Sequence, residues 1–374
     1  MALDVPMTTA SPALEVDRTR LQAIDCDLHH AFTDWAVLRP YMDPGLRHRA
    51  ADSGGRGLAR HGFRSMAEPF GSAPLPASGA PNVEPGFVRD VLQEKGIDRA
   101  VLTGSVFSLG VQPNMDLAAA YARAMNDWTL ERWLLPNNCF KGSILIAQQD
   151  ADQAAGEIDR LGSNPAFVQV LMCSASEAPF GRRGFHPIYE ACVRNGLPLA
   201  LHIGGEGAGT SAPSTAVGHP NTFVEWYSAL PQSYMAHVMS LVTEGVFEKY
   251  PDLKIVLCEG GVGWVPHVTW RLEKNFKAVR AETPWLRMLP SEYIRRHFWF
   301  TSYPLEEFPG ENGLSKIFNM MGADQRVLFS SNFPHWDYGD PFEMVAAISD
   351  DVRRRIMVDN ALELYGSRLL APNS

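Results

Sequence analysis

RVLFSSNFPHWD, residues Arg326 to Asp337, is a short apolar run that ends in two serines, an asparagine, a Phe-Pro turn and His335. Its β-branched and aromatic side chains favour a strand. In a parallel barrel, polar side chains at the C-terminal ends of the strands build the active site. We therefore interpret this stretch as the last strand of such a barrel, which delivers polar side chains to one wall of a pocket.

Seven further apolar runs precede this strand. We expect strands at 21–26, 99–103, 142–147, 167–172, 197–202, 254–258 and 298–301. They alternate with helical segments, which predicts right-handed βα units around a parallel sheet. Eight such units predict one α/β domain, a (β/α)8 TIM barrel over residues 21–370.

The expected helices lie between and after these strands. Their ranges are 31–41, 87–95, 115–133, 151–161, 185–195, 222–250 with a break near Pro231, 265–280, 314–321, 340–349 and 351–364. Residues 52–86 are rich in Gly, Pro, Ala and Ser without periodicity, so we expect a lid or insertion loop there. Residues 1–20 are expected to form a flexible N-terminal tail.

The composition argues against several classes of protein. A formal charge of −9 without a Lys/Arg run disfavours a nucleic-acid partner. No window reaches the ~18 apolar residues of a membrane span, and the N-terminus lacks the pattern of a secretory signal. The five cysteines are scattered and odd in number, which favours free thiols in a reducing compartment. We therefore expect a cytoplasmic enzyme with a small-molecule substrate.

Polar side chains follow the expected strands at the end where a barrel places its site. In chain order they are Asp27, His29, Gln148, His202, Glu259, Thr301, Asn332 and His335. Histidines and carboxylates that converge at one mouth are a metal site by ligand type. Asp25 shares a strand face with Asp27 and is expected to orient a ligand. His30 either joins the site or faces away from His29.

Four motifs resemble the amidohydrolase superfamily: IDCDLHH, PLALHIGG, GVFEKYPDLKIVLCEGGVGWVP and VLFSSNFPHWD. They are most similar to the branch of aminocarboxymuconate-semialdehyde decarboxylase, over residues 22–366. The resemblance implies a distorted (β/α)8 barrel with a metal at the strand ends, and a dimer. It places the family's first-strand ligands on Asp27 and His29 and its fifth-strand ligand on His202. Its sixth-strand histidine falls on Glu259 and its eighth-strand aspartate on Asn332.

The last two positions depart from that family. An amide has no basicity near neutral pH, so Asn332 cannot act as the general base of a hydrolase. A mixture of carboxylates and histidines suits iron or manganese with open positions. In these departures the chain resembles the non-haem dinuclear iron monooxygenases of the same fold, such as the platensimycin-type diterpenoid hydroxylase.

Our leading hypothesis is an O2-dependent monooxygenase that hydroxylates an aliphatic C–H bond of a small carboxylate-bearing or terpenoid-like substrate. Two iron ions, or iron and manganese, would be held by Asp27, His29, His202, Glu259, Asn332 and His335. Glu259, His335 and Asp27 are expected to act in catalysis, and Asp337 is expected to orient ligands together with Asp25.

Two alternatives stay open. The first is a mononuclear zinc or manganese hydrolase or decarboxylase of a small carboxylate, in which His335 or Glu259 activates water. The second is a non-catalytic partner subunit of an active paralogue. Metal identity and number separate the enzymes, because two iron-type ions favour the monooxygenase and one zinc or manganese favours the hydrolase or decarboxylase.

Overall fold

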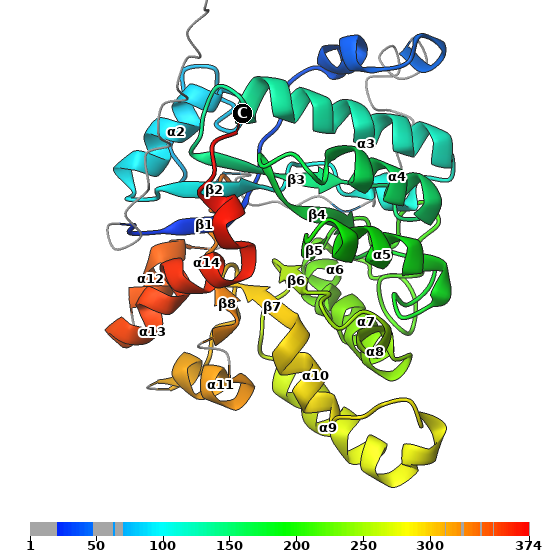
Figure 1. Cartoon of the computed structure of the whole chain (residues 1–374). Coiled ribbons are helices and arrows are strands. Elements are labelled where there is room, and N and C mark those ends of the chain that lie inside the picture. The colour runs from blue at the N-terminus through cyan, green and yellow to red at the C-terminus, as the bar shows by residue number, and fades with distance from the viewer. Residues whose placement is uncertain are drawn as a thin grey trace, which may run out of the picture.

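The computed structural model describes residues 21–47, 63, 70–310, 312–322, 325–336, 339–346 and 348–373. Eight parallel strands pair in chain order (Figure 1). They are β1 Ile24–Leu28, β2 Arg99–Leu102, β3 Phe140–Leu145, β4 Phe167–Cys173, β5 Leu199–His202, β6 Ile255–Cys258, β7 Phe298–Thr301 and β8 Val327–Leu328. The predicted α/β barrel is therefore confirmed, with its strands close to the expected positions.

Backbone hydrogen bonds between β1 and the segment after β8 close the ring. The amide of His29 donates to Phe333 O at 2.9 Å, and the amide of Asn332 donates to Asp27 O at 3.1 Å. Because β8 contains only two residues, these bonds help to hold the polar stretch SSNFPH against the first strand.

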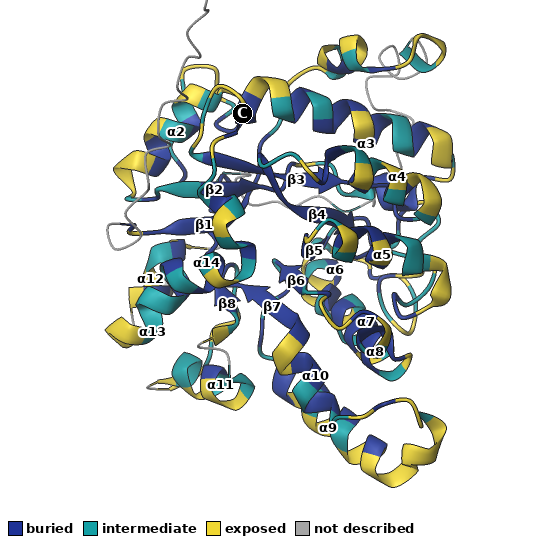
Figure 2. Ribbon diagram, in the orientation of Figure 1, coloured by how far each residue is buried: buried dark blue, intermediate teal, exposed yellow. Residues whose placement is uncertain are grey.

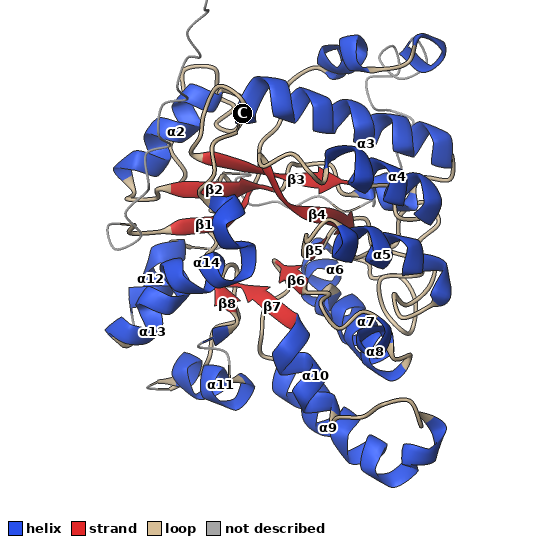
Figure 3. Cartoon of the chain, in the orientation of Figure 1, coloured by secondary structure: helices blue, strands red, loops and turns tan. Residues whose placement is uncertain are grey.

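Helices surround the strands on the outside of the barrel (Figure 3). They are α2 Pro85–Glu94, α3 Met115–Thr129, α4 Ala151–Leu161, α5 His186–Arg194, α6 Phe223–Ala229, α7 Pro231–Thr243, α8 Val246–Lys249, α9 Val265–Val279, α10 Pro290–His297, α11 Gly313–Met321, α12 Pro341–Ala346, α13 Asp350–Arg354 and α14 Asn360–Tyr365. A 3-10 turn, η2 Trp35–Tyr41, follows β1.

Three helical regions differ from the expectation. The range 31–41 contains only η2, which includes Pro40, and proline disfavours a continuous α-helix. The range 222–250 forms three helices, because Pro231 begins α7 and Gly245, with φ of 75°, separates α7 from α8. The helix α10 was not expected, since its eight residues are too few to show a clear period.

Buried residues line the strands, and exposed residues lie mainly on the outer helices (Figure 2). Every residue of β1 and of β3 through β7 is buried. The inside of the barrel is therefore a packed core. An active site can form only at the strand ends and in the loops beyond them. Within the described ranges no helix is long and apolar enough to cross a membrane.

About half of the segment 52–86 falls outside the described residues, which omit 48–62 and 64–69. From residue 70 it runs as loop and turn to the start of α2. A parallel bridge joins Gly71 to Trp336, which follows β8. The end of the segment thus lies beside the strand-end face, and its role as a lid stays a prediction. The expected tail, residues 1–20, is also outside the described residues.

His237 on α7 secures the chain beyond β4. Its Nε2 lies 2.7 Å from Ser174 O, and its Nδ1 accepts from the amide of Phe180 at 3.2 Å. One ring nitrogen must donate and the other must accept, so these bonds require the neutral imidazole. Burial accordingly lowers the pKa of His237 to about 4.

We expect this histidine to make stability depend on pH. Its ordinary pKa is 6.5 and its folded pKa is about 4, so between these values the unfolded chain binds a proton that the folded chain does not. Its contribution is complete above pH 6.5 and is lost as the pH falls, by roughly 2 kcal/mol at pH 5.

Urea denaturation at pH 7 and pH 5 checks this prediction. His237→Gln should show a smaller loss of stability between the two pH values than the wild type. His219→Gln, at an exposed position, serves as the matched control and should behave as the wild type does. Equal losses in all three proteins would show that His237 is not responsible.

Candidate metal centre

Three buried side chains meet at the C-terminal ends of β1 and β5. One ligand atom from each of Asp27, His29 and His202 lies within 4.8 Å of the others. Asp27 belongs to β1, His29 comes two residues later, and His202 ends β5. The structure therefore brings together three of the residues that the sequence predicted as metal ligands.

Hydrogen bonds fix both imidazole rings. Nδ1 of His29 lies 2.6 Å from Gly104 O, and Nδ1 of His202 lies 2.7 Å from Ile203 O. A carbonyl oxygen only accepts, so each Nδ1 carries a proton and the neutral ring keeps its lone pair on Nε2. This is how metal-binding histidines are usually oriented in proteins.

Two buried polar atoms of this group have no hydrogen-bond partner, namely Oδ2 of Asp27 and Nε2 of His202. They lie 3.4 Å apart. The other carboxylate oxygen of Asp27 accepts from the Thr103 hydroxyl at 2.6 Å. Buried polar atoms normally find a partner, and a carboxylate with imidazole nitrogens is a donor set for divalent manganese, iron or zinc. The site therefore fits a metal ion.

Glu259 approaches the same centre from the end of β6. Its Oε2 lies 3.3 Å from Nε2 of His202, and its Oε1 accepts from the Tyr227 hydroxyl at 2.7 Å. Its backbone has φ of 60°, and its amide donates to Thr301 Oγ1 at 2.9 Å. Non-glycine residues hold such a backbone only where the surroundings fix it. Burial raises the pKa of the Glu259 carboxyl.

Asn332 faces His29 from the segment after β8. Its Oδ1 lies 2.5 Å from Nε2 of His29. Because Nδ1 of His29 already donates to Gly104 O, Nε2 of His29 is an acceptor. Either the Asn332 amide presents its Nδ2, which is buried without a partner, to this nitrogen, or a cation binds Nε2 and Oδ1 together. Asn332 has φ of 55°, a left-handed conformation that asparagine adopts more readily than most residues.

His335 lies on the same side of the centre. Its ring is 5.1 Å from the ring of His29 and 6.4 Å from that of Phe70, measured between centroids. It is not one of the three residues whose ligand atoms lie within 4.8 Å of one another. Its roles as a ligand and in catalysis therefore stay predictions.

The charges at the centre are coupled. Burial opposes protonation of His202, but Asp27 and Glu259 outweigh it and raise the pKa of His202 to about 9. Burial also opposes ionisation of Asp27, yet His202 and His29 hold its pKa below the ordinary value. When His202 is protonated, its Nε2 carries a proton and offers no lone pair to a metal ion. A metal ion has to displace that proton.

Asp25 precedes Asp27 on β1 and connects this strand to the segment after β8 through hydrogen bonds. It accepts from the amide and the hydroxyl of Ser331, at 3.0 and 2.5 Å, and from the amide of Asp27 at 3.1 Å. Burial raises the pKa of Asp25 to about 7. It therefore positions a metal ligand through the backbone of Asp27.

Three further predicted residues have other positions. His30 turns away from the centre, with Nε2 2.8 Å from the Thr129 hydroxyl. Gln148 donates to Cys173 O at 3.0 Å and to Ala175 O at 3.1 Å, and so supports the loop after β4. Asp337 lies outside the described residues.

The sequence did not single out three residues that contact the centre: Thr103, Tyr227 and Phe107. The ring of Phe107 stacks on His202 with 3.9 Å between centroids and 2° between planes. Thr103 ends an expected strand, so its position alone could have indicated that it lies at the site. Tyr227 and Phe107 lie on a helix and in a loop, where no local pattern marks them.

Comparison with known proteins agrees with this geometry. Residues 24–367 match the family model described as amidohydrolase. Gamma-resorcylate decarboxylase of Polaromonas sp. is 25% identical over 295 residues, which cover 74% of this chain and 85% of that protein. A 2-amino-3-carboxymuconate-6-semialdehyde decarboxylase of Dictyostelium discoideum is 27% identical over 195 residues, 50% of this chain and 49% of that protein.

The fold is also shared with a solved 5-carboxyvanillate decarboxylase of Novosphingobium aromaticivorans, complexed with manganese and 4-hydroxy-3-methoxy-5-nitrobenzoic acid. The TM-score is 0.67 at 18% identity, over 96% of this chain and 99% of that one. A dihydroxybenzoic acid decarboxylase of Polaromonas sp. with bound manganese and 2-nitroresorcinol gives a TM-score of 0.64 at 18% identity, over 92% and 97%. Together, the barrel, its strand-end cluster and the family match over residues 24–367 show that this chain belongs to the amidohydrolase family.

Proposed function

We propose that this chain is a metal-dependent decarboxylase of an aromatic or closely related carboxylate. The observation that carries the proposal is the centre itself, where one ligand atom from each of Asp27, His29 and His202 lies within 4.8 Å of the others. Oδ2 of Asp27 and Nε2 of His202 are buried there without a hydrogen-bond partner, and Asn332 stands beside His29. Hydrolysis needs a base that activates water, and Asn332 cannot supply one. Decarboxylation needs no attacking water, so the amide is compatible with it.

The relatives reported in the preceding subsection change the ranking of the hypotheses drawn from the sequence. They are decarboxylases. This favours the decarboxylase alternative over the monooxygenase, which was the leading hypothesis from the sequence alone. The complete Asp27–His29–His202 cluster likewise favours an enzyme over a non-catalytic partner subunit.

Asp27, His29 and His202 would hold the metal, with Glu259 and Asn332 beside them. The bound metal would supply a Lewis acid that fixes the carboxylate of the substrate. The remaining chemistry is one proton transfer: a proton adds to the carbon that bears the carboxylate, the C–C bond breaks, its electron pair returns to the ring, and CO2 leaves.

We assign that proton to Glu259. Its carboxyl group faces the centre beside His202 and is hydrogen-bonded to the Tyr227 hydroxyl at 2.7 Å. Tyr227 gives the carboxyl a partner with which it can exchange a proton between turnovers. The phenyl ring of Phe107, stacked on His202, covers one side of the centre and limits the access of water.

The donor set also supports a second candidate, the O2-dependent hydroxylase. Two carboxylates, two histidines and an amide around one point form a mixture that iron accepts well. His335, which is beside the centre, is the residue that a second metal ion would require. This candidate predicts two iron ions, or iron and manganese, in each chain.

Elemental analysis of the purified protein separates the two candidates. The decarboxylase predicts one divalent metal ion per chain, and activity that disappears with a chelator and returns with manganese or zinc. Two iron-type ions per chain, with O2 uptake on addition of Fe(II), would overturn the decarboxylase proposal. Asp27→Asn serves as the control, because it should lose the metal in either case.

A further inference from the structure

Glu206 is a buried acid that the proposed reaction does not use. It follows the metal ligand His202 in the loop after β5, and only 2% of its surface is exposed. A buried acid is strongly unfavourable unless its oxygens find hydrogen-bond partners. The partners of Glu206 therefore show which part of the structure it holds in place.

Both carboxyl oxygens of Glu206 bond to the loops around it. Oε2 accepts from the amide of Gly204 at 2.8 Å, and Oε1 accepts from the hydroxyl of Ser174, which follows β4. The backbone of Glu206 is also held, because its carbonyl oxygen accepts from the Ser214 hydroxyl at 3.1 Å and from the Trp226 indole at 3.0 Å. The carboxyl group therefore has a fixed position relative to the turn at Gly204.

The amide of Gly204 belongs to the same peptide unit as the carbonyl group of Ile203. That carbonyl oxygen accepts from Nδ1 of His202 at 2.7 Å. A trans peptide unit is planar, so its N–H and its C=O point in opposite directions and cannot turn independently of each other. Glu206 and His202 thus bond to the two ends of one rigid group.

This arrangement acts on the ring of His202 in two ways. It fixes the acceptor for Nδ1, which keeps a proton there and leaves the lone pair of the neutral ring on Nε2. It also polarises the peptide unit, because hydrogen bonds that follow one another in a chain strengthen each other. A stronger acceptor at Nδ1 makes the imidazole a more basic metal ligand.

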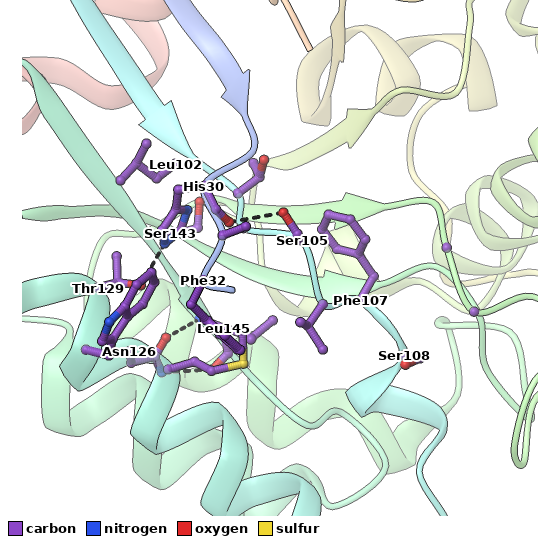
Figure 4. Close-up of a pocket in the computed structure, with 18 of the residues that line it drawn as sticks. His30, Phe32, Leu102, Ser105, Phe107, Ser108, Asn126, Thr129, Ser143 and Leu145 are labelled. Carbon is purple, nitrogen blue, oxygen red and sulfur yellow. Dashed lines mark hydrogen bonds between the residues drawn. The ribbon is translucent and has the colours of Figure 1, made fainter. Parts of the chain in front are cut away.

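The turn between His202 and Glu206 depends on two glycines. Gly204 and Gly205 have φ of 128° and 94°, which other residues rarely adopt. A Cβ at position 204 would lie 3.2 Å from Cβ of Phe107, whose ring stacks on His202. Phe107 is labelled in Figure 4, in the wall of a cavity that both glycines also line. The turn and Phe107 therefore hold His202 together, the turn at Nδ1 and Phe107 at the face of the ring.

We propose that Glu206 is a positioning residue for the metal ligand His202 and acts through the peptide unit between Ile203 and Gly204. This role does not require a charge, because an amide N–H only donates and Oε2 therefore accepts from Gly204 in either protonation state of the carboxyl. The inference rests on the metal centre of the proposed function. It adds a residue outside that centre on which the affinity for the metal ion depends.

The affinity for Mn(II) tests this role without turnover. It is measured by titrating the full chain and following the electron paramagnetic resonance signal of the free ion. Glu206→Met fills similar space without an acceptor, and we expect it to bind Mn(II) about 10–100-fold more weakly, the usual loss for a residue that supports a metal ligand. Glu206→Gln keeps an acceptor for Gly204 and can donate to Ser174, so its affinity should stay close to that of the wild type.

A double-mutant cycle shows whether the effect passes through His202. In a chain that already carries His202→Ala, Glu206→Met should cause no further loss of Mn(II) affinity. Asn373→Ala is the matched control for a lost buried hydrogen bond. The Asn373 amide donates to Phe140 O at 2.8 Å, at the start of β3 and thus at the end of the barrel away from the centre. This variant should melt at a lower temperature and bind Mn(II) as the wild type does.

Four results would overturn the inference. They are wild-type affinity in folded Glu206→Met, an equal loss with and without His202→Ala, an affinity of Glu206→Gln as weak as that of Glu206→Met, and a comparable loss in Asn373→Ala. If melting curves show that Glu206→Met does not fold, Ser174→Ala takes its place. It removes the hydroxyl that donates to Oε1 and should weaken Mn(II) binding by a smaller factor, and unchanged affinity there would also overturn the inference.

The outcomes for Glu206 and for the decarboxylase are distinguishable, because Mn(II) binding is measured without substrate. Affinity that depends on Glu206, without CO2 release from any carboxylate, would leave the positioning role standing and remove the proposed function. CO2 release by the wild type, together with unchanged affinity in Glu206→Met, would do the reverse.

Discussion

Asp27→Asn and His202→Ala are expected to lower metal affinity by more than ~100-fold and to abolish activity. Loss of a residue that only supports a ligand typically weakens metal binding by 10–100-fold, so loss of a ligand should exceed that range. The two substitutions remove the pair whose facing atoms lie 3.4 Å apart without a hydrogen-bond partner.

Titration with Mn(II) against a competing chelator measures these affinities. Thr103→Val removes the hydroxyl that donates to Asp27 at 2.6 Å, and its loss should fall within the 10–100-fold range of a supporting residue. His219→Ala, at an exposed position, should bind as the wild type does. Wild-type affinity in Asp27→Asn or in His202→Ala would place the metal elsewhere.

Asn332→Asp is expected to give the centre the base that the wild type lacks. A carboxylate at this position would lie beside Nε2 of His29, where Asn332 Oδ1 is at 2.5 Å, and could take a proton from water. General-base catalysis contributes ~10²–10⁴-fold, so hydrolysis of an ester such as 4-nitrophenyl acetate by the zinc-loaded variant should rise by at least ~10-fold. The substitution changes one atom of the side chain, and aspartate tolerates the left-handed backbone.

Asn332→Gly is the matched control, because glycine accepts the φ of 55° but offers no base. Its ester hydrolysis should stay at the level of the wild type. If Asn332→Asp hydrolyses the ester no faster than Asn332→Gly, then the amide is not what prevents water activation. The argument against hydrolysis would then lose its physical basis.

The fold could be predicted because the strands are short, apolar and separated by helices. Eight such strand–helix units are typical of a (β/α)8 barrel. The first-strand face also follows from period-two spacing, which places Asp27 and His29 together. The bond between Asp25 and Ser331, by contrast, joins residues 306 positions apart. No local pattern reveals such a contact.

Glu259 and Asn332 show where sequence reasoning reaches its limit at the site. Both have positive φ, 60° and 55°, and strand periodicity does not determine where a side chain points from such a backbone. Their positions could be predicted from the motifs, but their directions could not. The sequence also left open whether His30 joins the site, because no local pattern reveals the contacts with Thr129 and Trp128 that turn it away from the centre.

From the sequence alone, the leading hypothesis was an O2-dependent monooxygenase. Asn332 stands where the family has an aspartate that could act as general base, and the mixture of carboxylates and histidines suggested iron. The relatives named above are decarboxylases, which favours the decarboxylase alternative. The dimer and the lid over residues 52–86 remain predictions.

Anaerobic release of CO2 tests the central claim most directly. The metal-loaded protein would be incubated without O2 with 2,6-dihydroxybenzoate, and the CO2 formed would be compared with that from Asp27→Asn. The account predicts metal-dependent CO2 release without O2, which is lost in Asp27→Asn. No release without O2, together with consumption of O2 and a hydroxylated product in air, would contradict it.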